Sequence, residues 1–134
     1  LVPLNKEFDH LKDYISLEQL RFSDRLNVQL NCEPIPDHIT IAPMLLLPFV
    51  ENSFKHGSII NGKLEVEITL TTNHKGIQFS VSNSSLEETL SHKGIGLTNV
   101  RKRLDLLYPK AYKLDIEQKE QRFTVNLNVF SHDE

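Results

Sequence analysis

Residues 43–57 have the sequence Pro43-Met-Leu-Leu-Leu-Pro-Phe-Val-Glu-Asn-Ser-Phe-Lys-His-Gly57, an apolar half followed by a polar half. They predict a buried helix from Pro43 to about Ser58, because proline suits the first turn of a helix and Gly57 suits its end. Pro48 is the difficulty in this interpretation, since a proline inside a helix removes a hydrogen bond and can kink the axis. The apolar half of the helix is expected to lie in the core.

Three polar side chains of this segment share one face of the predicted helix. At about 100° per residue, Asn52, Lys55 and His56 fall within one stripe, opposite apolar side chains. An amide oxygen is a neutral ligand for Mg²⁺, and ammonium and imidazole groups can donate to phosphate oxygens. The stripe is therefore a candidate site for a metal–phosphate group. The alternative is a solvated helix end, where Lys and His also suit the helix dipole.

The spacing of apolar residues predicts the other elements. Helical spacing predicts a first helix from Asn5 to about Ser23, with Asn5 as its cap, and a third helix from Leu97 to Leu107. Alternation predicts strands at 25–32, 64–70, 77–81, 114–116 and 123–129, the last four forming two hairpins. The polar residues 82–93 predict a mobile loop. This order predicts an α/β (α+β) two-layer sandwich, in which helices cover one face of a mixed or largely antiparallel sheet.

Composition restricts the classes of function. A chain of 134 residues with 39% hydrophobic residues suits one folded domain. Its 15 basic and 18 acidic residues give a net charge of −3, which argues against a nucleic-acid binder, and the basic run 101–103 is best interpreted as a solvated helix face. The single Cys32 fits a reducing compartment, and the six histidines lack the short spacings of a zinc site. The longest apolar run, 41–50, is too short for the roughly 20 residues of a membrane span.

Two further places are candidates for binding. The run Gly94-Ile95-Gly96-Leu97 stands at the start of the predicted third helix, where free backbone N–H groups can hold an anion. The alternative there is a flexible hinge before an ordinary helix. Asn83 shares the alternation of the apolar residues 77, 79 and 81, so its amide is expected to point inward, where a polar group needs a partner. That partner is a ligand or the backbone of a turn.

Taken in order, these segments resemble one family. Residues 43–57 resemble the N box of sensor histidine kinases, and Gly94-Ile-Gly-Leu-Thr-Asn-Val-Arg-Lys-Arg-Leu104 resembles their G2 box. The opening Val2-Pro-Leu, the run Tyr14-Ile-Ser-Leu-Glu-Gln-Leu-Arg-Phe22 and Arg25-Leu26 are similar to the subgroup called LytS-like. The resemblance extends from about Leu1 to Val129. It implies the ATP-binding catalytic domain of the GHKL superfamily, with the Bergerat fold and three helices on one face of the sheet.

The resemblance also implies roles for particular residues. It assigns Asn52 to Mg²⁺ bound to ATP, and Lys55 and His56 to the phosphates, with Asn52 and Lys55 serving catalysis. Glu51 matches an acidic position sometimes assigned as a catalytic base. The run 94–97, namely Gly94, Ile95, Gly96 and Leu97, would close with the lid over the phosphates. ATP and Mg²⁺ are the implied cofactors.

Two features depart from the family pattern. The G1 box of the family is Asp-x-Gly-x-Gly, whose Asp binds the adenine amino group; here Asn83 stands at the Asp position and the glycines are absent. An Asn oxygen can still accept that hydrogen bond, without the charge. The phosphoacceptor histidine of the family lies in a segment before the part matched here, and none of the six histidines sits in such a motif.

These features leave competing functions. The first is a protein histidine kinase domain that transfers the γ-phosphoryl of ATP to a histidine on a preceding helical domain, for relay to a response regulator of the LytTR type. The second is a degenerate nucleotide-binding or docking module, which the missing glycines favour. A GHKL domain of another branch, such as an ATPase or an anti-sigma kinase, fits the opening helix less well.

The resemblance also predicts organisation and setting. Residues 1–134 are expected to form one domain, with a leading helix at 1–24, an ATP lid at 84–95 and a polar tail at 131–134. The full protein is expected to be a homodimeric, membrane-anchored bacterial sensor kinase, with this domain in the cytoplasm. Nucleic acid is not an expected partner.

Overall fold

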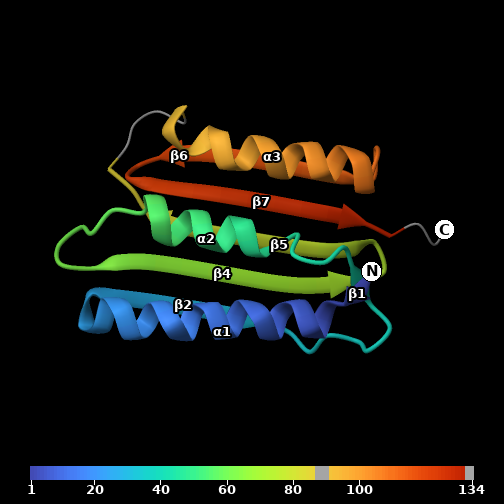
Figure 1. The fold of residues 1–134 in the computed structure, drawn as a ribbon, viewed down its shortest axis with the longest axis horizontal. Helices are drawn as coiled ribbons and strands as arrows, with labels where there is room; N and C mark the ends of the chain where they lie inside the picture. Colours follow the sequence, from blue (N-terminus) through green and yellow to red (C-terminus); the bar gives the residue numbers. More distant parts are fainter. Residues whose placement is uncertain (87–90, 132–134) are drawn as a thin grey trace.

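A five-stranded sheet forms one layer of the protein, and three helices cover one face of it (Figure 1). The computed structural model describes residues 1–86 and 91–131, and for residues 91–96 it describes the backbone alone. The helices are α1 (Leu4–Phe22), α2 (Leu47–His56) and α3 (Ser91–Leu107), and a short 3₁₀ turn, Ser23–Arg25, follows α1. The strands of the sheet are β2 (Leu26–Cys32), β4 (Leu64–Asn73), β5 (Gly76–Ser84), β6 (Tyr112–Lys119) and β7 (Arg122–Phe130).

The strand order is β2-β4-β5-β7-β6. Only β2 and β4 are parallel, with Leu26 opposite Leu64, and the other neighbours run antiparallel. The parallel pair requires a long connection, and the chain supplies it between residues 33 and 63, where α2 packs on the sheet. The predicted fold class, a two-layer sandwich on a mixed and mostly antiparallel sheet, is confirmed.

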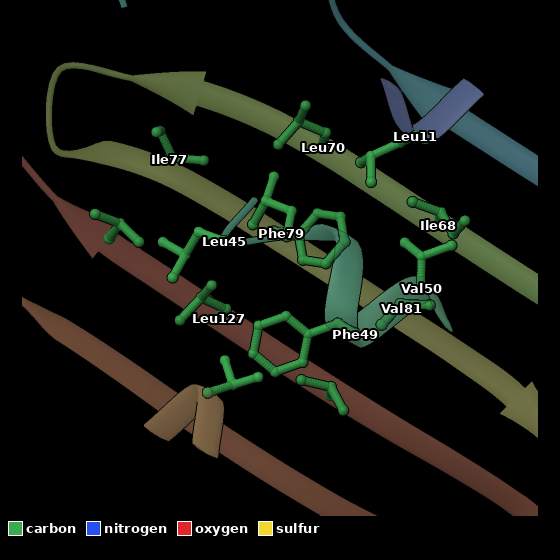
Figure 2. Packing of buried hydrophobic residues seen from close by; sticks show 14 of the residues in the cluster. Leu11, Leu45, Phe49, Val50, Ile68, Leu70, Ile77, Phe79, Val81 and Leu127 are labelled. Atoms are coloured by element: carbon green, nitrogen blue, oxygen red, sulfur yellow. The ribbon is translucent and has the colours of Figure 1, made fainter. Parts of the chain in front are cut away.

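The core lies between the helices and the inner face of the sheet. Strand β4 alternates buried Leu64, Val66, Ile68 and Leu70 with more exposed polar residues, as the sequence predicts. Figure 2 shows Phe49 of α2 next to Phe79 of β5, and the two ring centroids are 6.3 Å apart. Each large side chain buried in this way contributes about 1.5–3 kcal/mol. These contacts fix α2 across the middle strands.

Helix α1 confirms the predicted stripe and corrects its cap. Leu4, Phe8, Leu11 and Ile15 are buried on one face. The residue before the first turn is Pro3, and no side chain caps that end. The Asn5 amide instead donates to the carbonyl of Ile35, at 3.3 Å, and so ties α1 to the proline-containing connection after β2.

Helix α2 begins at Leu47, four residues later than the sequence predicted. Residues 43–46 form a turn, so Pro48 lies in the first helical turn, where a missing N–H costs nothing. The kink expected from Pro48 therefore does not arise. Gly57 ends the helix as predicted, but its φ of −71° is one that any residue adopts. Its small size matters instead: a Cβ there would lie 2.5 Å from both the Leu64 side chain and the Ser53 carbonyl oxygen.

Helix α3 begins at Ser91, six residues before the predicted start at Leu97. Of the predicted lid, 84–95, Ser84 ends strand β5 and residues 91–95 are helical, while 87–90 lie outside the described residues. A helix secured by packing of Leu97, Val100 and Leu104 can extend backward, because adding a residue to a helix costs less than starting one. Of the predicted tail, 131–134, only Ser131 is described.

A two-stranded sheet was not predicted from the sequence. It pairs β1 (Val2–Pro3) with β3 (Thr40–Ile41) in antiparallel register, and two residues are too few to show alternation. It brings the start of α1 next to the segment that leads into α2. Within residues 1–86 and 91–131, no helix is both long and apolar enough to cross a membrane.

Candidate functional site

Two buried amide groups define the candidate site. Asn52 on α2 is 8% exposed and Asn83 at the end of β5 is 1% exposed. Among the described residues, the Asn52 Nδ2 and the Asn83 Oδ1 are buried without a hydrogen-bond partner. An unpaired buried polar atom costs about 1–3 kcal/mol, so a ligand or an ordered water would stabilise each of these two amides.

The Asn83 amide has a fixed orientation. Its Nδ2 donates to the Ser84 carbonyl at 2.9 Å, so the unpaired atom is the acceptor, Oδ1. The amide also lies beside the end of α2, because a Cβ built on Gly57 would be 3.3 Å from its Nδ2. The inward orientation predicted from strand alternation is confirmed. The backbone alternative for its partner holds for the donor, and the ligand alternative stays a prediction for the acceptor.

A set of serine contacts anchors the segment after Asn83. The Ser84 hydroxyl donates to the Ser58 carbonyl at 2.7 Å, and the Ser58 N–H donates to the Ser84 carbonyl at 2.8 Å. The Leu86 N–H donates to the Ser58 hydroxyl at 2.9 Å. Ser85 is fully buried, and its N–H donates to the Gln121 carbonyl at 2.9 Å. The chain that leads into residues 87–90 is thus tied to the loop after α2 and to the β6–β7 turn.

The other candidates on α2 lie where helical spacing places them. Asn52 is buried, His56 is half-buried and Lys55 is exposed at the last turn. Glu51 is half-buried and lies toward α1, because its charge contributes to the raised pKa of Tyr14. Burial is the largest cause of that raised pKa, followed by the hydrogen bond that Tyr14 donates to Glu18 at 2.8 Å. Helical spacing separates Glu51 and Asn52 by about 100° around α2.

The run 94–97 lies inside α3 rather than before it. Because the helix starts at Ser91, the N–H groups left free by helix geometry are those of its first turn, and Gly96 and Leu97 follow that turn. Leu97 is 3% exposed and belongs to the core. The helix start, at which the sequence predicts an anion site, therefore lies at Ser91 rather than at Leu97.

Sequence reasoning missed a group of side chains that hold the turn before α2. Glu7 of α1 is 1% exposed and accepts hydrogen bonds from the backbone N–H groups of Met44 and Leu46, both at 3.0 Å. Arg103 of α3 donates to the carbonyls of Pro43 and Met44, at 2.9 and 3.1 Å. One signal was present: Glu7 lies on the apolar stripe of α1, between Leu4 and Leu11.

This arrangement of elements is the fold of histidine kinase catalytic domains. The catalytic domain of the histidine kinase ThkA, in a nucleotide-free form, matches 96% of this chain and 95% of its own, with a TM-score of 0.73 and 15% sequence identity. A structure of ThkA in complex with the response regulator protein TrrA matches 96% of this chain and 40% of its own, with a TM-score of 0.70 and 15% identity. At such identities the likeness shows the fold alone.

Similarity in sequence points to sensor proteins. The sensor protein LytS of Oceanobacillus iheyensis is 32% identical over 90% of this chain, and LytS of Bacillus subtilis is 28% identical over 92%. The sensor protein kinase HptS of Staphylococcus aureus is 28% identical over 75% of this chain. The chain spans only 24%, 23% and 17% of the length of these three relatives. No family model matches the chain. The resemblance to LytS-like sensor kinases is confirmed as similarity in sequence and in fold.

Proposed function

We propose that this chain is the ATP-binding catalytic domain of a two-component sensor histidine kinase. It would transfer the γ-phosphoryl of Mg–ATP to a histidine on another domain, for relay to a response regulator. One observation carries the proposal most directly: the unpaired amide atoms of Asn52 and Asn83 are buried on neighbouring elements of a histidine kinase catalytic fold. Similarity to LytS and HptS sensor proteins supports it.

Asn83 is proposed to recognise the base. Its Nδ2 is engaged by the Ser84 carbonyl, so its unpaired Oδ1 presents an acceptor. An acceptor suits the amino group of adenine and repels the carbonyl oxygen at the corresponding position of guanine. Preference for ATP over GTP follows from the orientation of one amide.

Asn52 is proposed to hold the metal, with Lys55 and His56 beside the phosphates. The Asn52 amide has no hydrogen bond that ties it to the described residues, so it is available to turn its oxygen toward Mg²⁺. Mg²⁺, when bound, would neutralise charge on the phosphate oxygens. Lys55 and His56, at the last turn of α2, would donate to those oxygens. The backbone at the start of α3, next to Gly94 and Gly96, would supply further donors.

Glu51 is a weaker candidate for catalysis. Its charge contributes to the raised pKa of Tyr14 on α1, and helical spacing places it about 100° from Asn52 around α2. A role as catalytic base would require a substrate group on the α1 side.

The acceptor histidine is proposed to arrive on another domain. His56 is held on a helix beside the proposed phosphate position, so we expect it to donate to the phosphates rather than to attack the γ-phosphorus in line. The proposed partners are a helical phosphoacceptor domain of the same kinase, a second kinase subunit, and a response regulator of the LytTR type. The setting proposed is the cytoplasmic side of a membrane-anchored bacterial protein.

A second candidate function is a docking module that no longer transfers phosphate. It is favoured by Ser85, which stands two residues after Asn83 where the family motif has glycine. Ser85 is fully buried and its N–H donates to the Gln121 carbonyl, so this position lacks the conformational freedom of a glycine.

Calorimetric titration separates the two functions at the binding step. The kinase function predicts that the chain binds Mg–ATP, with GTP bound at least about tenfold more weakly because its carbonyl oxygen meets Asn83 Oδ1. Asn83→Ala is expected to remove that preference. Equal affinity for ATP and GTP in the unmodified chain would contradict the assigned role of Asn83.

Transfer itself needs a second assay. The chain incubated with labelled Mg–ATP is expected to acquire no stable phosphohistidine. Label is expected on a supplied histidine-bearing helical segment of the full protein. Binding without transfer to that segment would favour the docking module. Stable label on His56 would contradict the proposal that the acceptor histidine lies on another domain.

A further inference from the structure

The turn before α2 is held from both sides. We define residues 42–46 as the connector, which joins β3 to α2. Helix α1 contacts it through Glu7, and helix α3 contacts it through Arg103. Tyr108, the residue directly after α3, accepts through its hydroxyl a hydrogen bond from the Ala42 N–H at 2.9 Å. No other segment described in the structure shows a carboxylate and a guanidinium from two helices bonded to the backbone of one turn.

Glu7 acts on the start of α2. Its two carboxylate oxygens accept the Met44 and Leu46 N–H groups at 3.0 Å, and Leu46 is the residue that caps α2. A carboxylate in this place satisfies backbone donors and suits the positive end of the helix dipole. Because Glu7 is only 1% exposed, its charge is balanced by these contacts rather than by water.

Arg103 acts on the carbonyl side of the same turn. Its two terminal nitrogens donate to Pro43 and Met44, at 2.9 and 3.1 Å. Met44 has a φ of 60°, in the left-handed region that is strained for a residue with a Cβ. Its N–H is held by Glu7 and its carbonyl by Arg103, so the strained turn persists because two charged side chains fix it.

We infer that Glu7 and Arg103 are positioning residues for the metal–phosphate end of the site. They set where α2, and with it Asn52, lies relative to α3, and neither belongs to the proposed ligand-binding set. The inference rests on the proposed function of Asn52. The base end of the site depends on Asn83, which lies on β5 beside Gly57, at the opposite end of α2 from the connector. Loss of the Glu7 or the Arg103 contact with the connector should therefore weaken the Mg²⁺-dependent part of ATP binding. The part that depends on the base should stay unchanged.

The test compares the affinity of the chain for ATP in excess Mg²⁺ with its affinity in EDTA. The ratio of the two affinities measures the metal-dependent part. Glu7→Gln and Arg103→Gln are each expected to reduce this ratio about five- to tenfold, the effect of losing hydrogen bonds to a charged group, while the affinity in EDTA changes less than about twofold. Arg103→Lys should restore part of the ratio, because lysine can reach one carbonyl but not both.

Matched controls come from neighbouring exposed residues that make no connector contact, Asp13→Asn on α1 and Lys102→Gln on α3. Both should keep the ratio of the unmodified chain. Far-UV circular dichroism checks that each variant is folded. If Glu7→Gln fails to fold, the variants of the partly exposed Arg103 still test the inference.

Three results would overturn the inference. An equal fall of both affinities would show a general structural role for Glu7 and Arg103, and unchanged affinities would show that the connector does not act on the site. A ratio of one in the unmodified chain would overturn the role of Asn52 as well, which distinguishes failure of the proposed function from failure of the positioning role alone.

Discussion

Asn83 is expected to lower the stability of the nucleotide-free protein while it serves nucleotide binding. Its side chain is 1% exposed, and its Oδ1 has no partner among the described residues. Asn83→Leu replaces the amide with an apolar side chain of similar size. The change removes an unpaired acceptor, worth about 1–3 kcal/mol, and loses one hydrogen bond worth about 1 kcal/mol. The Ser84 carbonyl keeps its bond from the Ser58 N–H at 2.8 Å, so no new unpaired group arises.

The expected net result is a gain of about 1–2 kcal/mol in the free energy of unfolding, since leucine also adds buried apolar surface. In a chain of this size each kcal/mol raises the midpoint of thermal unfolding by about 3–5 °C. The assay is urea and thermal unfolding of the nucleotide-free chain, followed by titration with Mg–ATP, in which Asn83→Leu should lose most of its affinity. Asn126→Leu, on the exposed face of β7, is the matched control and should change stability by less than about 0.5 kcal/mol.

The reasoning would be refuted by a clear loss of stability in Asn83→Leu. That result would mean that the Asn83 oxygen is paired in the nucleotide-free protein, and the argument that it awaits a ligand would fail. Retained ATP affinity in a stabilised variant would instead show that the base lies elsewhere.

Three more perturbations follow from the structure. Asn52→Ala should lower the affinity for Mg–ATP in calorimetry and leave the urea midpoint nearly unchanged; unaltered affinity would remove Asn52 from the metal site. Gly57→Ala should destabilise the fold by about 1–3 kcal/mol in urea unfolding, because its Cβ would meet the Ser53 carbonyl oxygen at 2.5 Å, and a neutral effect would show that α2 can shift. Burial and Glu18 raise the pKa of Tyr14 above its usual 10, so the folded chain retains this proton at high pH. The stability that Tyr14 contributes is therefore complete below about pH 10 and is lost as the pH rises further, and Tyr14→Phe should make unfolding less sensitive to pH above about 10.

The repetitive elements could be predicted because their burial repeats along the chain. Strand β4 shows this most clearly, since its buried and exposed residues alternate from Leu64 to Leu70 as the pleat of a strand requires. The Asn83 orientation followed from the same alternation. The order of elements and the motifs around Asn52 and Gly94 then restricted the fold to one family resemblance, which the structural comparison bears out.

The ends of the helices could not be predicted because tertiary contacts fix them. The sequence placed the start of α2 at Pro43, where a proline is locally favourable, but the helix starts at Leu47. The start depends on Glu7, which lies 37 and 39 residues away from the two N–H groups that it accepts. No window along the sequence contains both partners of such a contact.

Contacts between residues far apart in the sequence also explain why the prediction of a solvated helix face for residues 101–103 is wrong for Arg103. A solvated helix face is the usual role of such a run, and Lys102 is exposed as expected. Arg103 differs because it lies one turn before the connector-facing end of α3, with Leu104 buried next to it and Tyr108 also bonded to the connector. What distinguishes Arg103 from its neighbours is its angle around α3, combined with two backbone carbonyls in a turn where Met44 takes a left-handed conformation. The functional meaning of a charged residue therefore depends here on the conformation of a turn 60 residues earlier, and the Mg²⁺-dependence of ATP binding in Arg103→Gln measures that dependence directly.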